Sequence, residues 1–239
     1  MGAGLHVLLN ERIPRGEVDK DVISVYSKYT VITRPLTASL RTRDRILKAA
    51  QRLIATRGAD ACTTRAVAAA AGITAGAIYR HFASRDELVG HAVELALESF
   101  ERHLLDAIIS LPVGSFARVA ALGTAYVQFA QQHEEEFRVL FMPVGRARSG
   151  LGEVFAKSAY PILRRCVVEA MASGEIREAD PDTVALFVWT RVHGIVTLFM
   201  GCDVEAVIEA SEKIDPAAFF EQTGVLVRDG LRRPDSYRE

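Results

Sequence analysis

Closely spaced helix boundaries in residues 41–88 constrain the fold more than any other feature of the chain. Glycines that can end helices alternate here with side chains that accept hydrogen bonds from the first N–H groups of a helix. The alternation predicts four helices that start within this stretch, and therefore a compact helical module. The expected stops are Gly58 and Gly72, and the expected starts are Thr63, Thr64, Thr74 and the capping box Ser84-x-x-Glu87.

The residues around Gly72 predict two helices that cross at a tight turn. Gly72 can adopt the left-handed backbone of such a turn, and Ala68 is small enough for a close crossing. Val67, Ile73 and Ile78 are placed to fill the wedge between the two helices. A second helix held outward in this way can enter the major groove of DNA. Other helix pairs joined by a short turn share part of this pattern.

Charge is distributed unevenly, although the whole chain carries a formal net charge of only −1. Residues 39–86 contain nine Lys and Arg residues against three Asp and Glu residues, which gives +6 and leaves −7 on the remainder. A basic segment on an acidic body is typical of a module that contacts phosphates. A solvated charged face is the alternative explanation.

Composition indicates a globular protein, with 49% hydrophobic and 25% charged residues. We expect it to be cytoplasmic and free of disulfides, because its three cysteines form no disulfide or zinc pattern and its start lacks a secretory signal. No apolar run approaches the length of a membrane span, so no membrane association is expected. Residues 1–38 favour extended structure and are predicted to form a poorly ordered arm. The cysteines are Cys62, Cys166 and Cys202.

Helical periodicity continues beyond residue 88, and no stretch after residue 41 is typical of a strand. The expected fold is all-α, with an N-terminal three-helix domain in residues 39–86 joined to a larger helical ligand-binding and dimerisation domain in residues 87–239. Glycines, prolines and serines separate the periodic stretches. Those stretches predict helices at about residues 88–110, 116–133, 134–141, 151–172, 182–200 and 216–228.

Residues 43–88 resemble the DNA-binding domain of the TetR family of transcriptional regulators. The resemblance implies that residues 74–81 form the recognition helix and that the partner is a double-stranded, palindromic operator. It also implies that hydroxyls, rings and cations in this stretch contact phosphates. Phe82, three residues after Tyr79, is itself expected to belong to the core. The expected DNA-contacting residues are Arg43, Thr64, Arg65, Thr74, Ala75, Gly76, Ala77, Tyr79, Arg80, His81 and Arg85.

The recognition segment departs from the family at one point that matters for sequence readout. The family often has a basic residue after the helix cap, where this chain has Ala75 followed by Gly76 and Ala77. Base readout would then depend on Thr74, Arg65 and alanine methyl groups against thymine, or on DNA shape. Because this segment has few long side chains, an alternative function is possible for the chain: a helical protein-interaction module that has lost DNA binding.

Trp189-x-x-x-His193-Gly194 resembles a signature of one TetR subgroup. Gly194 would let another helix approach closely, and Trp189 and His193 share a helix face. A core tryptophan beside a hydrogen-bonded histidine is one interpretation, and direct ligand contact is the other. The helices at residues 151–172 and 182–200 are apolar on more than one face, so they are expected to form a homodimer seam.

A small hydrophobic ligand is the expected effector, because aromatic residues gather in the larger domain. Its binding would tilt the helix that begins at Arg85 and release the protein, acting as a repressor, from DNA. No cofactor, metal or catalytic residue is expected, since the acidic run beside His133 points in different directions around a helix. The expected pocket residues are Phe100, Tyr126, Phe129, Phe141, Tyr160, Trp189 and His193.

Overall fold

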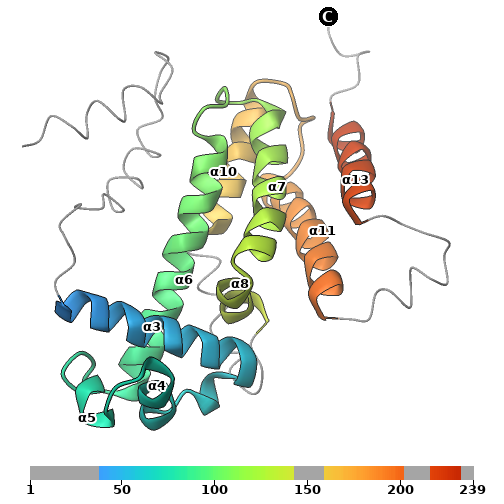
Figure 1. Cartoon of the computed structure of the whole chain (residues 1–239). Helices are drawn as coiled ribbons and strands as arrows, with labels where there is room; N and C mark the ends of the chain where they lie inside the picture. The colour runs from blue at the N-terminus through green and yellow to red at the C-terminus, as the bar shows by residue number, and fades with distance from the viewer. Residues whose placement is uncertain (1–37, 143–158, 202–215, 233–239) are drawn as a thin grey trace, which may run out of the picture. The chain divides into compact units, whose positions relative to one another are not determined.

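The computed structural model describes residues 38–142, 159–201 and 216–232, and these form helices with no strand among them. The expected all-α class is therefore confirmed (Figure 1). The predicted arm at residues 1–38 falls almost entirely outside the described residues. The elements are α3 (Ala38–Arg57), the 3-10 helix η1 (Ala59–Ala61), α4 (Thr64–Ala71), α5 (Ala75–Ile78), α6 (Arg85–Ile108), α7 (Phe116–Gln132), α8 (Glu134–Phe141), α10 (Ala159–Ala172), α11 (Pro181–Gly201) and α13 (Pro216–Leu231).

The described residues divide into two compact units. The N-terminal unit contains described residues 38–103 and 129–142, and the C-terminal unit contains 104–128, 159–201 and 216–232. Helices α6 and α7 each contribute residues to both units. The expected division into residues 39–86 and 87–239 remains a prediction about domains.

The N-terminal unit is built on α3, whose apolar side forms the core predicted from the sequence. Ile46 and Ala50 are 0% exposed, and Leu53 and Ile54 on the following turns are also buried. Gly58 has a φ of 84°, which side-chain-bearing residues rarely adopt, and its N–H donates to the Ile54 carbonyl at 3.0 Å. The backbone therefore turns out of the helix where the sequence predicts it to.

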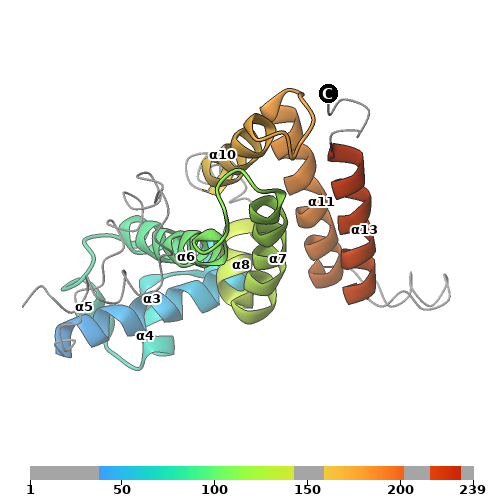
Figure 2. The same cartoon turned by 90° about the horizontal axis from the view of Figure 1, so that it is seen from above.

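Helix α8 packs against α3 within the same unit (Figures 1 and 2). Phe137 of α8 is fully buried, and Leu140 is 3% exposed. At the rim of this contact, Arg52 Nε of α3 lies 3.0 Å from Glu135 Oε1. Burial of the apolar side stabilises the packing far more than the exposed ion pair does.

The C-terminal unit is held by contacts between segments distant in sequence. Ser173 Oγ donates to the Gly114 carbonyl at 2.6 Å, which joins the end of α10 to the turn before α7. A Cβ added at Gly123 of α7 would meet Val192 Cγ2 of α11 at 3.5 Å, so α7 and α11 pack closely there. Helices α11 and α13 lie side by side in both views (Figures 1 and 2).

Most expected helix bounds agree with the structure to within a few residues. Helix α3 begins earlier than expected, at Ala38, and α13 continues past the expected end to Leu231. The helix expected at residues 151–172 is described only from Ala159, as α10, and its earlier part lies outside the described residues.

Helix α11 bears on the expectation that no apolar run approaches the length of a membrane span. Among the described residues it is the one helix long and apolar enough to cross a membrane, with a mean hydropathy of 1.5 over its best window. Length and composition alone are weak support for a span, because helices that pack in soluble proteins meet the same criteria. Only 28% of that window is buried within the chain.

Candidate nucleic-acid interface

The turn between α4 and α5 has the geometry that its residues predict. Thr63 caps α4 by accepting a hydrogen bond from Ala66 N at 3.2 Å. Gly72 ends the helix in the left-handed conformation, with φ 66° and ψ 39°. The next residue, Ile73, donates from its backbone N to the Ala68 carbonyl at 3.0 Å. These local bonds set the direction in which the chain leaves α4.

Apolar packing behind the turn holds α5 in place. Val67 and Ile78 are 0% exposed, and Ala68 is 3% exposed, as the predicted wedge requires. Phe82, which follows α5, is 1% exposed and draws the chain back into the core. The buried residues lie on one side of α5, so its other side is left to solvent.

The recognition segment is shorter as a helix than the sequence predicts. Helix α5 ends at Ile78, and the expected residues up to His81 continue as a turn in which His81 N donates to the Ile78 carbonyl at 2.9 Å. Thr74 has the extended backbone of a helix cap, but its side chain makes no capping hydrogen bond. Gly76 within the segment has a low helix propensity, which favours a short helix.

Several of the expected DNA-contacting side chains are exposed to solvent. Tyr79 is 58% exposed, and Arg65, Thr74 and Arg80 are also exposed. Tyr79 Oη lies 3.5 Å from Thr64 Oγ1, so the first turn of α4 and the end of α5 meet through two hydroxyls. Hydroxyls and guanidinium groups placed together in this way can contact successive phosphates of one strand.

Two expected contacts are placed elsewhere by the structure. Ala77 is only 7% exposed and belongs to the core, so its methyl group cannot meet thymine as expected. Arg85 donates from Nη2 to the Ala59 carbonyl, and its Nη1 lies 3.0 Å from Asp86 Oδ1. Arg85 therefore fastens the start of α6 to η1, although more than a third of its side chain is exposed.

The remaining expected residues flank the exposed side. The Arg43 guanidinium lies over the Phe82 ring, 5.1 Å from its centroid, which restricts where that cation can point. Gly76 is exposed, and a side chain there would meet no atom within 4 Å. Ala75 and His81 are partly exposed.

The capping box that starts α6 is confirmed. Glu87 N donates to Ser84 Oγ at 3.0 Å, and the Glu87 carboxylate accepts from Ala83 N. The long helix therefore begins at a fixed place directly after the segment expected to contact DNA.

The expected pocket residues gather in separate clusters. In the N-terminal unit, the Phe100 ring contacts Phe129 and Phe141, with centroids 5.0 and 5.3 Å apart. Phe100 and Phe129 are fully buried. This aromatic cluster is apolar core of the kind that helical spacing predicts.

A second cluster in the C-terminal unit joins Tyr126 of α7 to Trp189 and His193 of α11. Tyr126 Oη lies 2.7 Å from His193 Nδ1, and the Trp189 and His193 rings stack with centroids 5.1 Å apart. Burial raises the pKa of the Tyr126 phenol and lowers the pKa of His193, so both groups are held neutral. The prediction of a hydrogen-bonded histidine beside the tryptophan is confirmed.

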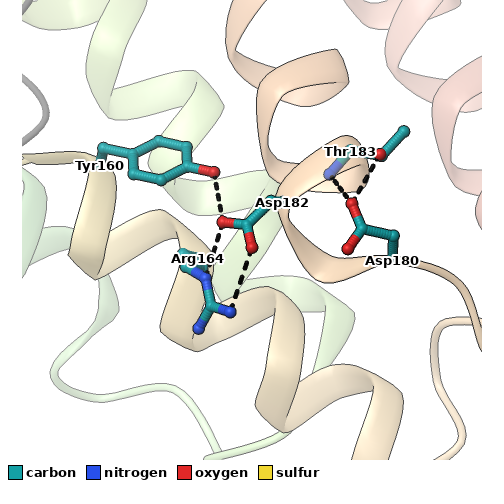
Figure 3. Close-up of polar contacts among 5 residues, drawn as sticks. All are labelled: Tyr160, Arg164, Asp180, Asp182 and Thr183. Atoms are coloured by element: carbon teal, nitrogen blue, oxygen red, sulfur yellow. Dashed lines mark hydrogen bonds and ion pairs between the residues drawn. The ribbon is translucent and has the colours of Figure 1, made fainter.

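Tyr160 lies in a third cluster, shown in Figure 3. Its hydroxyl donates to Asp182 Oδ1 at 2.8 Å, and Arg164 binds the same carboxylate through Nε at 2.8 Å and Nη2 at 3.2 Å (Figure 3). The Arg164 hydrogen bond, followed by that of Tyr160, lowers the pKa of Asp182. The three side chains fasten α10 to the first turn of α11, which gives Tyr160 a structural role.

Two features of α11 are not among the sequence-based expectations. Asp180 caps the helix by accepting from Thr183 N at 2.7 Å and Thr183 Oγ1 at 2.6 Å (Figure 3), and those bonds lower the pKa of Asp180. The Asp-x-x-Thr spacing before the helix is a usable signal for this cap. Arg191 contacts α13, and no local pattern indicates that partner.

Known families match both parts of the chain. Residues 46–92 match the bacterial regulatory proteins of the tetR family, and residues 119–223 match the tetracyclin repressor-like C-terminal domain. Together these matches span well over half of the chain. No curated protein gives a significant match.

Solved structures share the fold over most of their length. A protein of unknown function from Rhodococcus sp. RHA1 is 26% identical, with a TM-score of 0.63 over 80% of this chain and 96% of that one. The ketosteroid transcriptional regulator of Mycobacterium tuberculosis is 21% identical, with a TM-score of 0.60 over 80% and 95%. The transcriptional regulator FadR from Bacillus subtilis, in complex with stearoyl-CoA, is 18% identical, with a TM-score of 0.63 over 79% and 99%.

The exposed segment after the Gly72 turn, the long helix that follows it and the two family matches agree with one another. The chain therefore belongs to the TetR family of bacterial regulatory proteins, with a helix-turn-helix domain followed by a tetracyclin repressor-like C-terminal domain.

Proposed function

We propose that the chain is a homodimeric repressor that leaves its DNA operator when a small hydrophobic ligand binds. The observation that carries this proposal is the exposed face around α5, where Thr64 and Tyr79 meet within a segment of net charge +6. A segment with excess positive charge, whose side chains end in hydrogen-bonding groups, suits phosphate contacts. Within the face, Arg65 and Thr74 are the side chains best placed for base readout.

Dimerisation is supported by an exposed apolar face on α11. Phe187 is 51% exposed and Leu198 is 54% exposed, three turns apart on one side of the helix. Gly194 lies between them, and a side chain there would meet no atom within 4 Å. No helix among the described residues fills that space, so a second copy is the occupant that would use the close approach Gly194 allows.

Helix α13 extends the same surface. Leu226 is 72% exposed and Val225 is 45% exposed, on a helix that lies beside α11 (Figures 1 and 2). The described part of α10 exposes only Val168 among its large apolar residues. The proposed seam is therefore α11 with α13, in place of the expected pairing of α11 with the helix at residues 151–172.

A hydrophobic ligand is supported by the relatives and by one polar cluster. One structural relative is a ketosteroid transcriptional regulator, and another was solved in complex with stearoyl-CoA. In this chain, Tyr126, Trp189 and His193 place hydrogen-bonding groups among buried valines. A mostly apolar ligand with one oxygen function could exchange with the Tyr126–His193 hydrogen bond.

In the proposed mechanism, α6 couples ligand binding to DNA binding. The helix begins at Arg85, beside the DNA-binding segment, and runs without interruption to Ile108 in the C-terminal unit. A ligand that binds only one orientation of α6 would bias the position of α5 and lower operator affinity.

The decisive experiment measures binding of the full chain to duplex DNA from upstream of its own gene, at several salt concentrations. Affinity for a palindromic site that falls steeply with salt, and falls again with a ligand that stabilises the protein, supports the proposal. Arg228 is an exposed arginine in the C-terminal unit. The variant Arg228→Ala controls for loss of a positive charge outside the N-terminal unit, and it should bind the duplex as the wild-type chain does.

The opposite outcome is equally clear. A chain that shows no salt-sensitive binding to any such duplex refutes the DNA-binding proposal and favours the alternative, a protein-interaction module that has lost DNA binding. A chain that binds DNA but keeps its affinity when a stabilising ligand is bound refutes the release mechanism alone.

A further inference from the structure

Arg191 makes polar contacts from α11 to α13. Its Nη2 donates to the Phe220 carbonyl at 2.8 Å and to Thr223 Oγ1 at 2.6 Å. Its guanidinium also lies over the Phe220 ring, 5.0 Å from the centroid. One side chain therefore contacts the backbone, a hydroxyl and a ring in the first half of α13.

This contact is costly for the protein. Burial lowers the pKa of the Arg191 guanidinium, and its Nε is buried without a hydrogen-bond partner among the described residues. No carboxylate in those residues forms an ion pair with it. A partly buried cation without a counterion destabilises the fold unless its bonds hold something in place.

The other end of α13 is fastened separately. Arg177 N donates to the Leu231 carbonyl at 2.9 Å, and Ile176 pairs with Arg232 in an isolated bridge. Leu231 and Val227, in the second half of α13, are buried. Among the described residues, two sets of contacts orient the first half of α13: the Arg191 hydrogen bonds, and the Phe220 ring, whose Cζ would lie 4.0 Å from a Cβ added at Gly123 of α7.

Arg191 also lies at the border of the proposed dimer surface. Phe187, Arg191, Gly194 and Leu198 recur at i, i+4, i+7 and i+11, so they share one side of α11. On α13, the exposed Leu226 is three residues after Thr223, less than one turn away. The arginine thus joins the two helices whose exposed apolar residues form the surface.

We propose that Arg191 is a positioning residue that fixes α13 against α11 and so completes the surface covered by a second copy of the chain. This inference rests on the proposed homodimer. A lysine could not replace the arginine fully, because an ammonium cannot lie flat over the Phe220 ring while it donates to the Phe220 carbonyl and to Thr223 Oγ1.

The test compares Arg191→Met, Arg191→Lys and Arg228→Met in the full chain. Arg228 is an exposed arginine on α13 that pairs with its neighbour Asp229, so its variant controls for loss of a positive charge on the same helix. Sedimentation gives the dimer dissociation constant, and hydrogen exchange gives the protection of α13. We expect Arg191→Met to weaken the dimer at least tenfold and to increase exchange in the first half of α13, with Arg191→Lys intermediate and Arg228→Met unchanged.

A wild-type dimer constant in Arg191→Met, or unchanged exchange in α13, overturns the inference. If Arg191→Met does not fold, Thr223→Val removes one acceptor and should change both readouts in the same direction by a smaller factor; no change in Thr223→Val then overturns it. A wild-type chain that stays monomeric refutes the proposed homodimer itself, a result distinct from either variant outcome.

Discussion

His193 carries the clearest pH dependence at the scale of single residues. Burial lowers its pKa in the folded chain below the ordinary value of 6.5, so the unfolded chain binds the proton more readily. The stabilisation is complete at pH values above 6.5 and is lost progressively as pH falls below it. We expect the melting temperature of the C-terminal unit to drop on acidification, and His193→Gln to flatten that drop.

The matched control for this prediction is Tyr126→Phe. It removes the hydroxyl that lies 2.7 Å from His193 Nδ1 but leaves the ring buried. Stability should fall by about 1 kcal/mol at neutral pH while the slope with pH is retained. Melting curves recorded from mildly acidic to mildly alkaline pH distinguish the two effects, and an unchanged slope in His193→Gln would refute the assignment.

Arg65 provides the corresponding test of the DNA-facing surface. It is exposed in the first turn of α4, near Thr64 and Tyr79. If it contacts a phosphate, Arg65→Ala should weaken binding on every duplex and reduce the slope of log affinity against log salt by about 1. If it reads a base, the loss is confined to duplexes carrying that base, which a panel of operator variants would reveal.

Single residues differ in how well the sequence predicts their contacts. Thr63, Gly72 and Ser84 act within a few residues of their own position, and the sequence predicts their turns and caps correctly. Arg85 and Arg191 bind groups 26 and 29 residues away, which only the tertiary packing defines. Local pattern therefore predicts neither of these two tertiary bonds.

At the scale of elements, two glycines of the helix-turn-helix make a matched pair. Gly72 has a φ of 66°, and Gly76 lies inside α5 with a helical backbone; neither would bring a Cβ within 4 Å of another atom. Gly72→Ala should therefore destabilise the fold by roughly 1–2 kcal/mol through backbone strain alone. Gly76→Ala should stabilise it by about 0.5–1 kcal/mol, because alanine favours the helix.

Urea unfolding of both variants measures the difference. The opposite signs are the diagnostic result, since packing contributes to neither substitution. If Gly72→Ala left the free energy of unfolding unchanged, the left-handed turn could not be what orients α5. If Gly76→Ala stabilises the fold but weakens operator binding, close approach of the α5 backbone to DNA explains the glycine.

Elements are predictable where their ends are marked locally. The capped starts of α4 and α6 agree with the sequence, and α8 agrees to the residue. The sequence predicts too long a recognition helix, since the helix ends at Ile78 and residues 79–81 continue as a turn. The expectation for Ala77 is wrong for a related reason, since one turn of helix gives too little periodicity to define a face.

At the scale of the whole molecule, the sequence predicts the family and the all-α class but not the surfaces made by distant segments. Aromatic residues that are expected to share one pocket lie in distinct clusters. Helical spacing indicates which residues are buried, but it does not indicate which residues from other helices they contact. The apolar face of α11 is visible in the sequence, whereas the contribution of α13 depends on where tertiary contacts place that helix.

The proposed function makes DNA binding depend on the oligomeric state, and Leu198→Glu tests that dependence. Leu198 is 54% exposed on the α11 face that also carries Phe187 and Gly194, so the substitution costs the isolated chain little. In a dimer it would bury a carboxylate in an apolar seam, which is unfavourable without a partner. We expect a folded monomer by sedimentation and circular dichroism.

Operator binding by that monomer should fall by far more than a single lost contact explains. Two linked half-site contacts multiply their affinities through effective concentration, and a monomer retains only one. Thr197→Glu is the matched control, because Thr197 is on the same turn but bonds to the His193 carbonyl within α11. If Leu198→Glu remains dimeric and binds the palindrome as tightly as wild type, the second copy does not cover this face of α11, and the seam must be sought elsewhere in the chain.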